Sequence, residues 1–152
     1  EDAEKRRSGW ALWLLGNRTN LSLCGVGLLL LRLMIGVIFV VHGLQKVAPI
    51  LGGKGFDSAK GAASATGLEP VVLWAVLLVV AELGGGVAMI LGLATRVAAL
   101  LTAVVMVVAL TTAHAGDPFV ATHTQQMLLV GSIVLVVAGG GVLSLGWGRG
   151  RP

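Results

Sequence analysis

The chain is poor in charged residues. Only 12% of its 152 residues are charged, 56% are hydrophobic, and the mean hydropathy is +0.93. This composition excludes an ordinary soluble domain and is typical of a protein solvated by the lipid bilayer. A net charge of +4 would suggest a nucleic-acid partner in a soluble chain. Here the basic residues flank apolar segments, so we expect no nucleic-acid binding.

The chain also lacks the residues that several kinds of redox and ligand site need. Cys24 is the single cysteine, so thiol–disulfide exchange within one chain is excluded. The run Gly84–Gly86 lies inside an apolar segment with no preceding strand, which indicates helix packing rather than phosphate binding. No His-x-x-His or Glu-x-x-His pair occurs, and this disfavours a metal centre.

Four apolar segments dominate the sequence, and each is close to the ~20 residues that cross a membrane. They predict an all-α fold, a transmembrane antiparallel four-helix bundle. The turn at 92–96 is tight, so the helices on either side of it should be antiparallel neighbours. The four expected helices are Leu21–Val41, Val71–Leu93, Val97–Ala113 and Met127–Leu143.

One long loop, Ala48–Glu69, joins the first two apolar segments. Asp57 or Ser58 can cap a short helix that runs through Ser64, and Gly67 can end it. The sequence therefore predicts a short helical outer loop that covers one end of the bundle.

We expect three regions. Residues 1–20 form a cytoplasmic N-terminal segment that either lies along the membrane surface or is a partly ordered tail, residues 21–145 form the membrane domain, and residues 146–152 form a cytoplasmic tail. The first apolar segment is expected to be a retained helix rather than a cleaved signal peptide. Four crossings place both termini on one side, where most basic residues lie. The positive-inside rule then predicts a multi-pass protein of a bacterial cytoplasmic membrane, with both termini cytoplasmic.

Two charges interrupt these apolar segments, Arg32 in the first and Glu82 in the second. An intramembrane charge costs several kcal/mol unless it is paired, so it marks a functional candidate. Helical rise places the two charges about 12 and 16 Å from the inner face, which predicts that they meet. The pair either locks two helices together or handles protons or a ligand.

A second polar cluster is expected near the outer ends of the helices. His42, His114 and His123 converge there, and Gln45 and Lys46 follow His42 by about one turn. Such a cluster can hydrogen-bond a quinone carbonyl, and a metal or a haem are alternatives. His42, Gln45, Lys46 and His114 are therefore candidate quinone-binding residues, although each could instead simply anchor a helix end.

Several motifs, in this order, resemble the DoxX family of small four-helix membrane proteins between Leu30 and Leu145. The motifs are Arg32 with His42-Gly43-Leu44-Gln45-Lys46, Gly52-Gly53, Glu82-Leu83-Gly84-Gly85-Gly86, Leu91-Gly92-Leu93-Ala94-Thr95-Arg96, His114, and Gly139-Gly140-Gly141-Val142-Leu143-Ser144-Leu145. The resemblance implies association with quinol-linked respiratory or sulfur-oxidising membrane complexes and with oxidant defence.

The chain departs from that family at two acidic positions. Its closing segment reads Ser144-Leu145-Gly146 where the family commonly has Ser-Leu-Asp, and Gln125 or Gln126 stands where an acidic residue is frequent. Fewer carboxylates are left for proton transfer, which favours an accessory subunit of a larger quinone-linked membrane complex over an independent catalyst. We expect no covalently bound cofactor, and a quinone could still contact the chain at Glu82 and His42. Two alternatives stay open, an independent quinone-dependent oxidoreductase and a ligand-free scaffold or assembly subunit.

Overall fold

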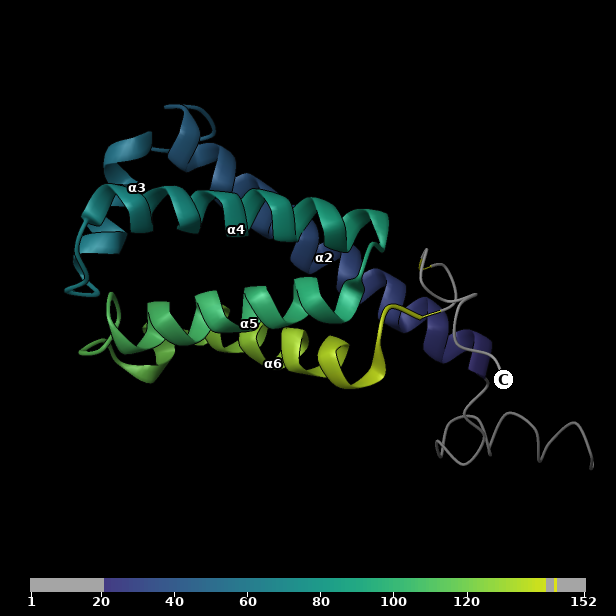
Figure 1. The fold of residues 1–152 in the computed structure, drawn as a ribbon. Coiled ribbons are helices and arrows are strands. Elements are labelled where there is room, and N and C mark those ends of the chain that lie inside the picture. Colours follow the sequence, from purple (N-terminus) through teal and green to yellow (C-terminus); the bar gives the residue numbers. More distant parts are fainter. Residues whose placement is uncertain (1–20, 142–143, 145–152) are drawn as a thin grey trace, which may run out of the picture.

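The computed structural model describes residues 21–141 and residue 144, and this part of the chain is entirely helical apart from its turns. Four long helices form the bundle: α2 (Leu21–Val47), α4 (Val71–Leu91), α5 (Thr95–Thr111) and α6 (His123–Ala138). Successive long helices run antiparallel (Figure 1), so the predicted all-α four-helix bundle is confirmed. The expected segments 1–20 and 146–152 lie outside the described residues.

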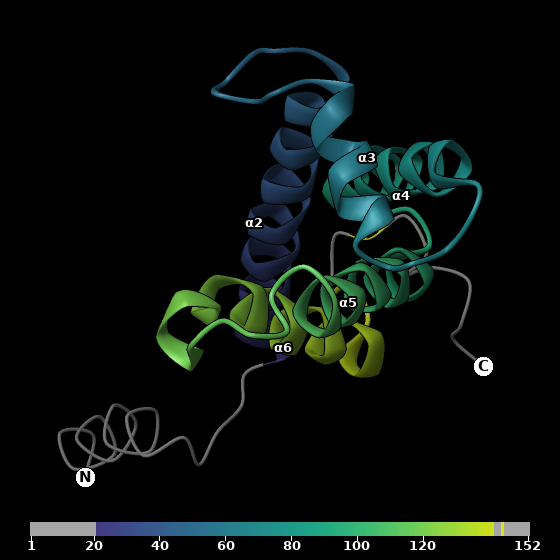
Figure 2. The same ribbon diagram turned by 90° about the vertical axis from the view of Figure 1, so that its left-hand side faces the viewer.

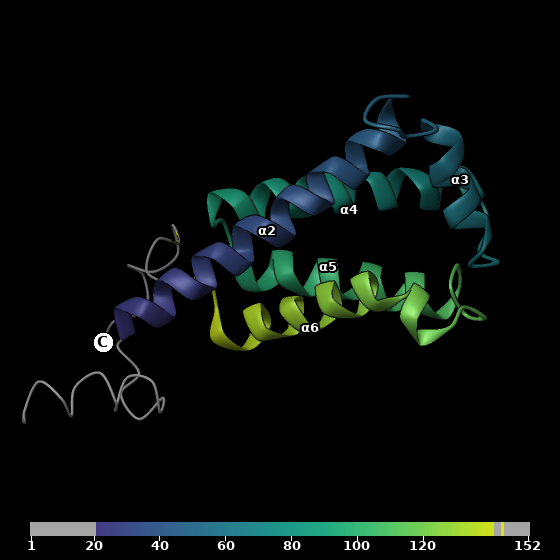
Figure 3. The same cartoon turned by 180° about the vertical axis from the view of Figure 1, so that it is seen from behind.

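The helices pack as two pairs, α2 against α4 and α5 against α6, and α4 links the pairs through its contact with α5. Helix α2 is inclined to the others: in Figure 2 it is seen from the side while α4 and α5 are nearly end-on. Figure 3 shows α2 crossing the bundle diagonally, with its N-terminal turns extending beyond the ends of the other helices. This offset decides which side chains of α2 reach which level of α4.

Glycine allows the close approach of α2 and α4. A Cβ on Gly86 would lie 2.8 Å from the carbonyl oxygen of Gly36, and a Cβ on Gly36 would lie 2.8 Å from that of Gly86. Small residues at such crossings let helix backbones touch. The core beside this crossing is apolar and includes the fully buried Phe39, Met89 and Leu135.

The loop after α2 contains the predicted short helix, α3 (Phe56–Ser64), which packs on α4 through the buried Ala59 and Ala63. Its end at Ser64 is as predicted. The predicted capping by Asp57 or Ser58 is wrong, because the N-cap is Gly55 with φ 68°, and no side chain caps the helix. The hydroxyl of Ser58 instead donates to the Gly55 carbonyl.

The boundaries of two helices, α2 and α6, differ from the sequence prediction in ways that matter for the site. Helix α2 continues to Val47 instead of ending at Val41, which keeps His42 and Lys46 on its last turns. Helix α6 begins at His123, after a single 3₁₀ turn, η1 (Phe119–Ala121), and ends at Ala138. Gly139 and Gly141 then adopt positive φ values of 82° and 74°, which end the helix before the predicted Leu143.

The outside of the bundle is apolar. Large hydrophobic side chains are exposed along every long helix, with Met34 63%, Val80 60%, Val97 59% and Val130 58% exposed. Two helices, Leu23–Val47 and Val71–Leu91, are long and apolar enough to cross a membrane, and Thr95–Thr111 and His123–Ala138 are shorter apolar helices. An exterior of this kind is typical of a helical bundle that lies in the lipid bilayer.

Candidate functional site

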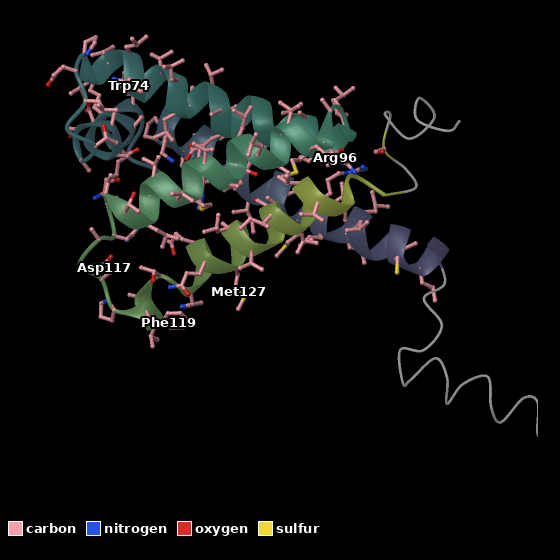
Figure 4. All side chains as sticks on the ribbon, turned by 60° about the horizontal axis from the view of Figure 1, so that its bottom comes forward. Trp74, Arg96, Asp117, Phe119 and Met127 are labelled. Carbon is pink, nitrogen blue, oxygen red and sulfur yellow. The ribbon has the colours of Figure 1, made fainter. Side chains whose placement is uncertain are left out.

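A cavity of about 590 Å³ lies inside the bundle at the end covered by α3. Figure 4 shows Trp74 and Asp117 at this end of the bundle and Arg96 at the opposite end. Most of the lining is apolar, and its volume falls within the ~300–1,000 Å³ range of small-molecule sites. Its lining also includes three threonines and five titratable or amide side chains from α2, α4, α6 and the segment after α5: His42, Lys46, Glu82, His114 and Gln125.

The cavity wall contains an ion pair between Lys46 of α2 and Glu82 of α4. The Lys46 Nζ lies 2.6 and 2.7 Å from the two carboxylate oxygens of Glu82. The side chains are 18% and 4% exposed. Lys46 reaches Glu82 because α2 continues beyond Val41 and brings its last turn to the middle of α4. The ion pair therefore places two opposite charges with no net charge at the cavity wall.

The predicted contact between Arg32 and Glu82 is wrong, since Glu82 pairs with Lys46 and Arg32 lies at the opposite end of the bundle. Arg32 Nη1 donates to the carbonyl of Gly140 at 2.9 Å and packs beside Gly92. Gly92, the C-cap of α4, follows Glu82 by ten positions, about 15 Å along the helix. Arg32 is 2% exposed, so its predicted burial is confirmed. It fastens the segment after α6 to α2.

His42 lies one turn before Lys46 on α2, and both side chains line the cavity. Residues four apart share a helix face, so this follows directly from the length of α2. The imidazole of His42 is half-buried, and among the described residues it has no hydrogen-bond partner. Its ring nitrogens are therefore available to a ligand.

His114 contributes a second polar edge. Its Nδ1 lies 2.6 Å from Asp117 Oδ2, and its Nε2 lies 3.3 Å from Gln125 Nε2. The Oε1 of Gln125 is buried and has no hydrogen-bond partner among the described residues. His114 and Gln125 line the cavity, whereas Asp117 lies outside it and is 48% exposed. Gln125 and Asp117 are near the histidines in the sequence, but neither is among the four residues that the sequence predicts to bind quinone.

Two other predicted members of the polar cluster are elsewhere. Gln45 is not among the cavity-lining residues; its amide donates to the Leu51 carbonyl at 2.6 Å and holds the loop after α2. His123 starts α6, bonds to the Val120 carbonyl through Nδ1, and is likewise absent from the lining. Of the four candidate quinone-binding residues, the structure brings three, His42, Lys46 and His114, to one cavity, which Glu82 also lines.

The cavity opens sideways between α4 and α5. Several side chains of these helices both line the cavity and are exposed on the outer surface: Trp74 38%, Leu77 47%, Leu101 46% and Val104 52%. Figure 1 shows α4 and α5 separating toward the α3 end. Because this surface is apolar, the mouth faces lipid when the bundle is in a membrane.

The donor set favours an organic ligand over a metal ion. Within residues 21–141 and 144, no group of three or more His, Cys, Asp or Glu side chains could hold a metal. An apolar pocket with a few convergent hydrogen-bonding groups is the usual form of a small-molecule site.

Comparison with known proteins agrees with the motifs. The DoxX family model matches residues 27–115, a span that contains His42, Lys46, Glu82 and His114. The Bacillus subtilis (strain 168) protein "Putative oxidoreductase CatD" is 35% identical over 121 residues, which cover 79% of this chain and 84% of that protein. No solved structure shows a significant match to the chain.

Proposed function

The chain belongs to the DoxX family of membrane proteins, and on that premise we propose that it is a subunit of a quinone-linked redox complex and binds a quinone head group in the cavity beside α3. The single observation that carries the proposal is the combination of an apolar cavity of about 590 Å³ with His42, the Lys46–Glu82 pair and His114 on its wall. The mouth between α4 and α5 gives a lipid-soluble molecule a route from the bilayer.

The residues present fit a quinone head group. A quinone takes up two electrons and two protons and needs hydrogen-bond donors at its carbonyls. Lys46 keeps an N–H beyond the two that it gives Glu82, and the ring nitrogens of His42 and His114 can donate or accept hydrogen bonds at the cavity wall. Leu77, Leu101 and Val104 would contact the ring and tail.

The side chains of the cavity supply protons and hydrogen bonds, and electrons have to come from another component. With Cys24 as its single cysteine, the chain cannot form a dithiol of its own. This favours an accessory role within a larger membrane complex. The second candidate is a quinone-dependent oxidoreductase in its own right, and the name of the Bacillus subtilis relative favours it.

For the membrane arrangement we propose that all four long helices cross a bacterial cytoplasmic membrane, with both termini cytoplasmic and the α3 end outside. Helices α5 and α6 have 17 and 16 residues, so they are only about 24 to 26 Å long. A local thinning of the bilayer, together with the turns at their ends, accommodates this length.

Photolabelling with an azido-quinone tests the proposed site. Ala109 lines the cavity from α5, so the substitution A109F should fill part of it and reduce labelling at least tenfold. Val107 lies on the outer surface of the same helix and is 46% exposed, so V107F is the matched control and should label like the parent. Equal labelling of A109F and V107F, or labelling of other subunits but never of this chain, would reject the site and leave the scaffold alternative.

Purification decides between the two redox roles. The accessory role is supported if a larger complex survives gentle extraction, and if this complex transfers electrons to quinone while the isolated chain does not. Electron transfer from a soluble donor to quinone by the isolated chain, lost on the substitution E82Q in well-folded protein, supports the independent enzyme.

A further inference from the structure

A polar connection leads from the cavity to the surface at the α3 end. The side chain of Asp117 is 48% exposed and that of His114 is 32% exposed, and their Oδ2 and Nδ1 atoms are 2.6 Å apart. His114 also lines the cavity. The imidazole of His114 therefore faces the cavity on one side and, on the other side, is linked to water through Asp117. Most of the remaining cavity wall is apolar.

Asp117 fixes the state of the ring. An ionised carboxylate only accepts hydrogen bonds, so Nδ1 of His114 carries the proton and Nε2 of the neutral ring is an acceptor. The amide of Gln125 donates to that acceptor at 3.3 Å. A carboxylate that holds a histidine tautomer in this way leaves Nε2 ready to take a proton.

Gln125 can serve both protonation states of His114. Its Oε1 is buried and lacks a partner in the described part of the chain while its Nε2 faces the imidazole. A half-turn of the amide exchanges these two atoms, and Oε1 would then accept from the Nε2–H of an imidazolium. The same oxygen could instead accept from a hydroxyl group of a ligand in the cavity.

We propose that Asp117 and His114 form a proton-exchange dyad between the cavity and the water at the α3 end, with Gln125 as a positioning residue. The proposal rests on the proposed quinone function. A quinone that receives two electrons from a redox partner in the complex needs two protons: the imidazolium of His114 would give its Nε2 proton to one oxygen, and His42 would supply the proton for the other. Water at the α3 end would reprotonate the rings, and oxidation of the quinol would run the same proton transfers in reverse.

The charges around His114 favour this role. Among the described residues, the titratable groups that line the cavity with it are His42 and Lys46 from α2 and Glu82 from α4, and α3 and α6 contribute none. Lys46 and Glu82 neutralise each other at 2.6 Å. The carboxylate of Asp117, in direct contact with the ring, is therefore the negative charge that stabilises an imidazolium at position 114.

Infrared difference spectroscopy on the purified full chain tests the dyad. Protein containing ¹³C-labelled histidine is loaded with decylubiquinone and reduced electrochemically, while a pH indicator follows proton uptake. The parent should show isotope-sensitive imidazole bands on reduction. H114Q should lose the imidazole bands that come from His114, and H42Q should keep them. D117N retains both imidazoles and should slow proton uptake about tenfold. The matched control D57N removes an exposed carboxylate at the same end and should behave like the parent.

The outcomes separate this inference from the function on which it rests. If the parent retains decylubiquinone but its imidazole bands are the same in H114Q, or if D117N and D57N take up protons equally fast, the dyad is refuted and the quinone site stands. If the parent retains no quinone, the proposed function itself fails and the dyad fails with it.

Discussion

Lys46 and Glu82 are joined by two short contacts, 2.6 and 2.7 Å, that tie the last turn of α2 to the middle of α4. Their side chains are 18% and 4% exposed in a bundle whose exterior is apolar. The pair thus links the two helices that form one side of the cavity, and it does so at the cavity wall.

Removing one partner of this pair should destabilise the protein strongly. K46M leaves the Glu82 carboxylate without its cation, at a cost of about 3 kcal/mol. The double variant K46M/E82L removes both charges and should recover most of the loss. Thermal unfolding in detergent measures both effects, and K60M, which breaks the exposed Lys60–Asp57 pair, is the control with an expected change below ~0.5 kcal/mol. Equal unfolding temperatures for K46M and K60M would contradict the prediction.

Arg32 should act on the segment that follows α6 and leave the cavity unaffected. R32M removes the buried hydrogen bond to the Gly140 carbonyl, which should cost about 2 kcal/mol. Amide hydrogen exchange should become faster around residues 137–141, with quinone labelling unchanged. R96M is the control, because Arg96 is exposed and its contact with the Val137 carbonyl is long, 3.4 Å. Faster exchange at Lys46 or Glu82 in R32M, with none near Gly140, would show that Arg32 acts elsewhere.

The sequence predicted the helices well because a long apolar segment bounded by glycine and proline can form few structures other than a helix. It also placed His42, Lys46 and His114 near one end of the bundle from helical rise alone. It predicted the wrong partner for Glu82, because the depth of each residue was counted by helical rise as if α2 and α4 spanned the same levels of the membrane with parallel axes. In the structure α2 starts beyond the ends of the other helices, which puts Arg32 level with Gly92 and Lys46 level with Glu82.

The tilt of α2 could not be read from the sequence because it results from packing between segments that are distant along the chain. Gly36 and Gly86 set the crossing point, but their contact depends on the whole α2–α4 surface. The cavity also results from packing between distant segments, so it could not be predicted from the sequence either. Its apolar residues look like ordinary lipid-facing or core positions in the sequence, and only the separation of α4 and α5 makes them a wall.

The Gly36–Gly86 crossing should tolerate no added methyl group. G86A places a Cβ 2.8 Å from the Gly36 carbonyl oxygen and 2.9 Å from the Val40 backbone nitrogen, so the helices must separate. Overpacking of this kind costs about 1–3 kcal/mol, and it should also weaken the Lys46–Glu82 contact. G84A is the matched control two residues away, where a Cβ meets nothing within 4 Å. Reversible unfolding should show a loss in G86A and none in G84A, and equal stability would place the crossing elsewhere.

The membrane orientation can be tested at two exposed residues at opposite ends of the bundle. Lys54 lies in the loop before α3, and Arg96 lies in the first turn of α5, next to the turn after α4. If the α3 end is outside, a membrane-impermeant maleimide added to intact cells should label K54C, in a background carrying C24S, and should not label R96C. After the cells are opened, both variants should be labelled, which shows that R96C is reactive. Labelling of R96C alone in intact cells would invert the orientation, and would move the exposed Asp117 and His114, and with them the exchange of protons, to the cytoplasmic side.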